Sequence, residues 1–147
     1  MSKYNRILVA VDFSEPSKLA LKKAIELAIE LKAELVVIHV FKMHARDLTE
    51  GGMEDASKIE SQAVKELEKK LKEFVEIHLN NEISVLTNIY VGDPYVEINQ
   101  AAAQTHADMI VMGTHGRTGL AHLVMGSVAE NVLRHAEVPV ISVRYTD

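Results

Sequence analysis

The 147-residue chain contains no cysteine, and this absence removes a whole set of chemistries. Disulfide bonds, thiolate metal sites and cysteine nucleophiles are all excluded. No apolar run approaches the roughly 18 residues that a membrane-spanning helix needs, and we expect no export signal before the first strand-like run. We therefore expect a cytoplasmic protein with no membrane partner.

Clusters of basic side chains are also lacking. The 16 lysines and arginines are outnumbered by 21 acidic residues, which gives a formal net charge of -5. The lysines of KELEKKLK (residues 65–72) alternate with glutamates, as is typical of a solvated helix face. Because binding to a phosphate backbone depends on clustered lysine and arginine, we expect no nucleic-acid partner.

Several familiar site motifs are missing as well. The chain has neither the P-loop pattern G-x-x-x-x-G-K-[ST] nor a G-x-G-x-x-G dinucleotide fingerprint after its first strand-like run. Its seven histidines form no H-E-x-x-H and no evident three-ligand cluster, so we expect no zinc held by the protein. His39 lies inside an apolar run and is interpreted as a packed or edge histidine.

What the chain does contain is a regular alternation of short apolar runs with longer amphipathic stretches. The runs predict five strands, at residues 6–13, 33–41, 83–92, 108–113 and 138–144. The stretches predict helices at residues 16–32, around 59–75, from 93–94 to about 106, and from 127 to about 136. Residues 42–53 lack clean periodicity and are interpreted as a loop.

This order predicts one domain spanning residues 1–147. Alternating strands and helices of this length indicate an α/β fold: a five-stranded, mainly parallel, doubly wound sheet with helices on both faces, a Rossmann-like α/β sandwich. The first, second and fourth runs are apolar almost throughout, as expected for strands that helices cover on both sides.

Residues suited to a ligand follow two of the predicted strands. In such sheets, ligands bind beyond the carboxyl ends of the strands, where the strand order reverses. Asp12 and Ser14 lie at the carboxyl edge of the first strand, and Gly113 and Gly116 lie at that of the fourth. If these strands are neighbours, one crevice holds both pairs, and the helix opened by Ser127 points its free N–H groups into it. This arrangement predicts a phosphate cradle.

Each of these residues also has a purely structural interpretation. The capping box formed by Ser127 and Glu130 makes Ser127 a helix cap as readily as a phosphate ligand. Asp12 can brace the turn before Pro16, and Gly113 can be a turn glycine that ends a strand. These alternatives stay open at the level of the sequence.

The stretch MGTHGRTGLAHLVMGSVAEN (residues 112–131) carries a more specific signal. In this stretch, two residues separate Gly113 from Gly116, and nine residues separate Gly116 from the pair Gly126 and Ser127. This spacing resembles the signature of the ATP-binding branch of the universal stress protein family. The segments ILVAVDFSEPSKLALKKAIELA, VVIHV and GSVAENVLRHAEVPVISVR resemble that family too. The resemblance covers essentially the whole chain.

The resemblance implies a site that holds ATP together with Mg²⁺ or Mn²⁺. It implies that Val40 contacts the adenine and that Asp12 lies near the ribose or a phosphate-bound metal. Arg117 is assigned loosely to the phosphates, and Gly119 lies outside the signature. The implied ATP-binding residues are Ala10, Val11, Asp12, Ser14, Val40, Met112, Gly113, His115, Gly116, Arg117, Gly126, Ser127 and Val128. His115 is the one histidine that we place at the site.

The expected function is ATP-dependent signalling in a stress response, with an unknown protein partner. The chain shows a cradle but no dedicated base or lysine clamp, so weak ATP hydrolysis is expected at most. The alternatives are a non-nucleotide interaction module of the same family and an adenylyl-transfer enzyme of related architecture. We also expect a homodimer through the last strand, because the run from Val138 to Arg144 is an apolar sheet edge.

Overall fold

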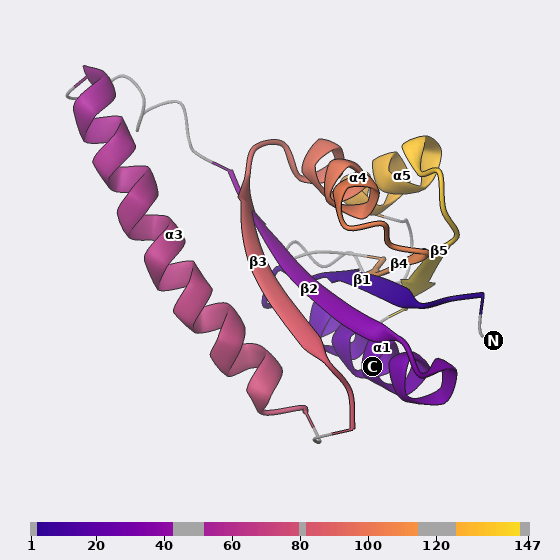
Figure 1. Ribbon diagram of the computed structural model, residues 1–147. Helices are drawn as coiled ribbons and strands as arrows, with labels where there is room; N and C mark the ends of the chain where they lie inside the picture. The colour runs from indigo at the N-terminus through magenta and orange to yellow at the C-terminus, as the bar shows by residue number, and fades with distance from the viewer. Residues whose placement is uncertain (1–2, 43–51, 80–81, 115–125, 145–147) are drawn as a thin grey trace.

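The computed structural model describes residues 3–42, 52–79, 82–114 and 126–144 (Figure 1). Its strands are β1 (Arg6–Ala10), β2 (Glu34–Phe41), β3 (Val85–Val91), β4 (Met109–Gly113) and β5 (Val140–Val143). Its helices are α1 (Glu15–Leu31), α3 (Gly52–Glu76), α4 (Pro94–Gln104) and α5 (Ser127–His135). No helix among these residues is long and apolar enough to cross a membrane.

The strands form one sheet in the order β3-β2-β1-β4-β5, and every neighbouring pair is parallel. Leu8 at the centre of β1 lies beside Val36 of β2 on one side and Ile110 of β4 on the other. The predicted doubly wound α/β fold is confirmed, and so are the pairing of the first and fourth strands and the place of the last strand at an edge.

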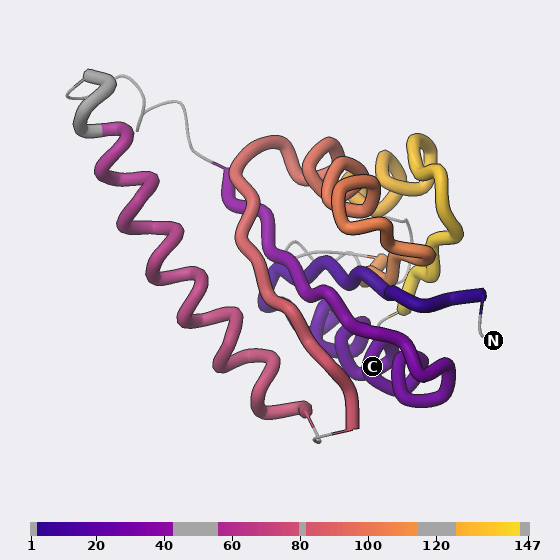
Figure 2. Tube along the Cα trace, in the orientation of Figure 1, coloured from indigo at the N-terminus to yellow at the C-terminus, as the bar shows by residue number. Residues whose placement is uncertain are grey.

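Two apolar cores hold the helices against opposite faces of the sheet. In Figures 1 and 2, α1 lies on one side of the strands and α4 with α5 on the other. Alternate residues of β1 divide between the cores: Ile7 and Val9 face α1 and α3, whereas Leu8 faces α4 and α5. Burial on both faces explains why the central strands are apolar at almost every position.

The ends of two elements differ from the predictions. The first strand stops at Ala10 rather than Phe13, because Phe13 has a left-handed backbone (φ 67°) that no strand accommodates. Helix α3 starts at Gly52, inside the segment 42–53 that was interpreted as a loop; residues 43–51 lie outside the described part of the chain.

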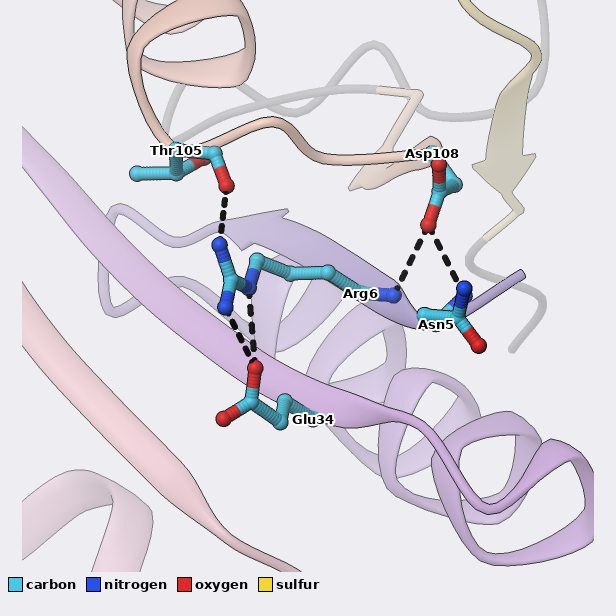
Figure 3. Close-up of polar contacts among 5 residues, drawn as sticks. All are labelled: Asn5, Arg6, Glu34, Thr105 and Asp108. Carbon is cyan, nitrogen blue, oxygen red and sulfur yellow. Dashed lines mark hydrogen bonds and ion pairs between the residues drawn. The ribbon is translucent and has the colours of Figure 1, made fainter.

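A polar cluster fastens the amino ends of the central strands (Figure 3). One oxygen of Asp108, Oδ2, accepts the backbone N–H groups of Asn5 (2.8 Å) and Arg6 (3.0 Å). The Arg6 guanidinium donates two hydrogen bonds to Oε2 of Glu34, from Nε at 3.0 Å and from Nη2 at 2.5 Å. It also donates to the backbone carbonyl of Thr105, the C-cap residue of α4. These contacts connect β1 to its two strand neighbours and to one helix.

We predict that removing the Asp108 carboxylate destabilises the fold. Asp108→Ala leaves two backbone N–H groups without their acceptor, so the free energy of unfolding should fall by about 1 to 3 kcal/mol. Asp108→Asn retains one acceptor oxygen and should lose less. Urea unfolding measures both values.

The control for this prediction is Glu130→Ala. Its carboxylate pairs with Arg134 (2.9 Å) on the exposed side of α5, where an ion pair contributes no more than about 1 kcal/mol. If Asp108→Ala lowered the free energy of unfolding no more than this control, the polar cluster would not contribute to the stability of the fold.

Candidate functional site

A cavity of about 320 Å³ lies at the carboxyl edge of the sheet, where the strand order reverses between β1 and β4. Nine of the predicted site residues line it: Ala10, Val11, Asp12, Val40, Met112, Gly113, Gly126, Ser127 and Val128. Ser14 is not part of the wall, although it contacts Asp12. The predicted residues His115, Gly116 and Arg117, and Gly119 beside them, lie outside the described part of the chain.

Six further residues complete the described wall: Ser17, His39, Pro94, Ile98, Thr114 and Ala129. Three of them directly neighbour a predicted residue along the chain: His39 beside Val40, Thr114 beside Gly113, and Ala129 beside Val128. Pro94 and Ile98 come from the start of α4, which carries no motif. Only the packing of α4 over the sheet brings these two residues to the cavity.

The turn after β1 is held by Asp12. Its Oδ1 accepts the backbone N–H of Ser14 (3.0 Å) and the Ser14 hydroxyl. Ser14 in turn is the N-cap of α1, because its Oγ accepts the N–H of Ser17 at 3.3 Å. Asp12 therefore braces the turn before Pro16, and the same residue lines the cavity, so its two interpretations are compatible.

Phe13 lies between these two residues in the left-handed conformation noted above, which is costly for a bulky side chain. Its ring is held from several sides. The ring centroid lies 4.7 Å from that of His39 and 5.4 Å, edge to face, from that of Phe74 in α3. The Lys70 ammonium lies 4.3 Å from it. Aromatic and cation–π contacts of this kind offset part of the backbone strain.

His39 belongs to the cavity as well as to this packing. Its Nδ1 lies 2.8 Å from the carbonyl of Val11, and because a carbonyl only accepts, Nδ1 carries the proton. The interpretation of His39 as a packed histidine holds, but His115 is not the only histidine to place at the site. The sequence could have indicated this, because His39 lies near the carboxyl end of β2, at the edge of the sheet where the site was predicted.

The entry into α5 differs from its prediction. Gly126 is the N-cap, with φ -63° and ψ 154°, and its N–H donates to the carbonyl of Thr114 at 2.6 Å. Ser127 is already the first helical residue, and Glu130 pairs with Arg134 instead of reaching back. The predicted capping box is therefore wrong, because the backbone bond to Thr114 places the start of the helix one residue earlier.

This geometry leaves the amino end of α5 directed at the cavity. The first N–H groups of a helix have no partner within it, and Ser127, Val128 and Ala129 of this first turn all line the wall. The positive end of the helix dipole lies there too. An anionic group fits this end of the cavity.

Gly113 has a reason of its own to be glycine. A Cβ at this position would lie 3.0 Å from the backbone carbonyl carbon and oxygen of Pro16, at the start of α1. The close approach of β4 to α1 therefore disfavours a side chain at this position whether or not a ligand is bound. Gly113 is neither a simple turn glycine nor a residue explained by a phosphate alone.

The remaining walls suit an apolar, flat group. Val11, Val40, Ile98 and Met112 supply aliphatic and thioether surface to the wall. Among the described residues, no group of three histidine, aspartate or glutamate side chains could hold a metal ion. The cavity combines an apolar region with an anion-binding helix end, which is the chemistry that a nucleotide needs.

Comparison with known proteins places the chain in a family. The model of the universal stress protein family matches residues 3–144. Universal stress protein MJ0531 of Methanocaldococcus jannaschii is 36% identical over 143 residues, covering 96% of this chain and 82% of that protein. MJ0577 of the same organism is 31% identical, covering 96% of this chain and 95% of that protein.

Solved structures agree with the sequence relatives. The structure of MJ0577 has a TM-score of 0.81 at 28% identity and covers 98% of both chains. The universal stress protein from Archaeoglobus fulgidus in complex with dAMP has a TM-score of 0.61 at 25% identity, covering 96% of this chain and 98% of that one. With nearly its whole length matched in sequence and in fold, this chain belongs to the universal stress protein family.

Proposed function

We propose that this chain binds ATP at the cavity between β1 and β4 and acts as a nucleotide-dependent signalling protein in a stress response. The observation that carries the proposal is the amino end of α5, which meets an apolar cavity at the reversal of the strand order. The Archaeoglobus relative that was solved with dAMP supports an adenine nucleotide as the ligand class.

In the proposed orientation, the phosphates face the amino end of α5 and the adenine faces the apolar part of the wall. The adenine lies against Val40 and the neighbouring apolar wall, and the phosphates lie at Gly126, Ser127 and Val128. There the backbone N–H groups and the Ser127 hydroxyl donate to phosphate oxygens. We assign His115, Gly116 and Arg117 to the ribose and phosphates on the family signature alone.

The metal in this proposal arrives with the nucleotide. The described wall holds no lysine or arginine that would neutralise a triphosphate, and Asp12 is its only carboxylate. Mg²⁺ or Mn²⁺ prefers oxygen ligands and binds through phosphates with one or two carboxylates. Asp12 is the residue that we assign to this metal or to the ribose.

Binding rather than efficient catalysis is the proposed role. Phosphoryl transfer needs a positioned base and charge neutralisation at the γ-phosphate. The described wall holds no lysine or arginine that could neutralise that charge. Slow hydrolysis is the most that we expect. An interaction module without a nucleotide remains the rival, and the following experiment separates the two.

We predict that Gly126→Val weakens ATP binding about tenfold or more and leaves the fold intact. A branched Cβ would stand where phosphate oxygens meet the N–H groups of α5, while φ -63° and ψ 154° suit valine without backbone strain. The stability cost should stay near 1 kcal/mol, the scale of an N-cap change. Isothermal calorimetry with ATP and Mg²⁺, together with thermal unfolding, measures both effects.

Two further variants sharpen the test. Ser127→Ala removes one hydroxyl donor and no cap, so it should weaken binding modestly at a stability cost below about 0.5 kcal/mol. Leu133→Val alters the exposed side of the same helix and should leave binding unchanged. No ATP binding by the parent protein at millimolar nucleotide with metal present would refute the proposed function. A folded Gly126→Val protein with parental affinity would refute the phosphate cradle.

We also propose that two copies of the chain pair through β5. Within the described residues β5 has one strand neighbour, β4. The carbonyls of Pro139 and Val143 accept from β4, so the backbone groups of the alternate residues, Val140 and Ser142, face the open edge. An edge of this kind invites a second strand, and an antiparallel pair about a two-fold axis satisfies both copies.

This pairing predicts a selective effect of proline at position 142. Ser142→Pro deletes an N–H that faces the open edge and leaves the hydrogen bonds to β4 in place, so a folded monomer should result. Ser142→Thr keeps the N–H and should remain a dimer. Sedimentation at tens of micromolar reads the assembly state, and a monomeric parent protein would contradict the proposal.

A further inference from the structure

Strand β1 separates from its neighbour β2 at the edge of the cavity. In the described part of the chain, the last backbone hydrogen bond between the two segments joins the N–H of Val11 to the carbonyl of Ile38 at 2.9 Å. The chain then turns away at Phe13, whose backbone is left-handed, while β2 continues to Phe41. The end of β2 therefore extends past β1, and it lines the cavity wall there.

The backbone groups of Val40 face the side that β1 has left. In a parallel strand, the N–H and the carbonyl of one residue face the same neighbour, and successive residues alternate between the two neighbours. The carbonyl of Ile38 accepts from the β1 side. The carbonyl of Phe41 accepts from Gly92, which follows β3. Val40 therefore turns both of its groups toward the β1 side, where no backbone hydrogen bond from the described residues reaches them.

The carbonyl of Val11 is the acceptor that a longer ladder would give to Val40. Since the N–H of Val11 bonds to Ile38, one more step would join the Val11 carbonyl to the N–H of Val40. Instead, this carbonyl lies 2.8 Å from Nδ1 of His39, which carries the proton. A side-chain donor thus takes the place of a backbone donor at the point where the strands separate.

The consequence is a donor and an acceptor on one edge of the cavity wall. The N–H and the carbonyl of Val40 lie on the same side of one residue, so they match a planar group that offers an acceptor beside a donor. The Watson–Crick edge of adenine has this arrangement, with a ring nitrogen beside an amino group. The pair is complete only while the N–H of Val40 is not bonded to Val11.

We propose that His39 is a positioning residue for base recognition: its Nδ1–H occupies the carbonyl of Val11 and so keeps the N–H of Val40 available to the purine. This inference rests on the proposed function, because it needs the adenine at Val40. Without the histidine donor, the carbonyl of Val11 would lack a partner, and an unpaired carbonyl is costly. It would then accept the N–H of Val40, and the base would lose its donor.

Two substitutions separate the donor of His39 from its ring. His39→Phe removes the donor and keeps an aromatic ring beside Phe13, which now lies 4.7 Å away between centroids. His39→Asn loses the ring and keeps an N–H donor at the same number of bonds from the backbone as Nδ1. If the ring rather than the donor mattered, the asparagine variant would be the more defective of the two.

Calorimetry with Mg²⁺ compares ATP with inorganic tripolyphosphate, which has no base. His39→Phe should bind ATP about three- to tenfold more weakly than the parent protein, as expected for one lost hydrogen bond. Its affinity for tripolyphosphate should change by less than about twofold, because the amino end of α5 is untouched. His39→Asn should recover most of the affinity for ATP.

The matched control is His78→Phe. Nδ1 of His78 also lies near a carbonyl, that of Phe74 at 3.1 Å, and its ring lies 6.0 Å from the Phe74 ring. His78 is not part of the cavity wall, so this variant should bind ATP like the parent protein.

Amide hydrogen exchange tests the same role without a ligand. In the nucleotide-free parent and in His39→Asn, the N–H of Val40 should exchange readily. In His39→Phe its exchange should slow by about tenfold or more, because the carbonyl of Val11 now accepts it.

The outcomes separate this inference from the proposed function. A parent protein that binds no ATP contradicts both. A parent that binds ATP overturns the role of His39 alone in any of three cases: if His39→Phe keeps the parental affinity, if it loses ATP and tripolyphosphate affinity equally, or if its Val40 exchange stays at the parental rate.

Discussion

The parallel pairing of β1 with both β2 and β4 is the constraint on which the rest of this molecule depends. The chain builds outward from β1 to β3 and then returns to the opposite side of β1. As a result, α1 leaves toward one face and α5 toward the other, and a cavity stays open between their first turns. At the amino edge, Asp108 and Arg6 hold the same three strands in register.

Much of this arrangement was predictable, because it depends on patterns that are local in the chain. Runs that are apolar almost throughout predicted the central strands, and the glycine motif predicted residues that line the cavity at the sheet edge. The errors arose where contacts between distant segments decide the local structure. The N-cap Gly126 donates its N–H to the carbonyl of Thr114, and the close approach of Pro16, far away in the chain, favours glycine at position 113.

Asn99 illustrates a different limit of sequence reasoning. A polar residue in the middle of an amphipathic helix is ordinarily interpreted as facing solvent, and nothing in PYVEINQAAAQ distinguishes Asn99 from Gln100. Only the packing of α5 against α4 reveals that one of these two amides is buried. Burial of polar groups is a property of the assembled fold, so such positions require coordinates.

The contact of Phe13 with α3 gives that helix more importance than its place at the side of the sheet suggests. Phe74 and Lys70 lie against a ring whose backbone is strained, and the two residues that flank it, Asp12 and Ser14, form the turn beside the cavity. Displacement of α3 would remove part of the support for this turn and would move the Asp12 carboxylate. The long helix thus contributes, through Phe13, to the positioning of the turn that carries Asp12.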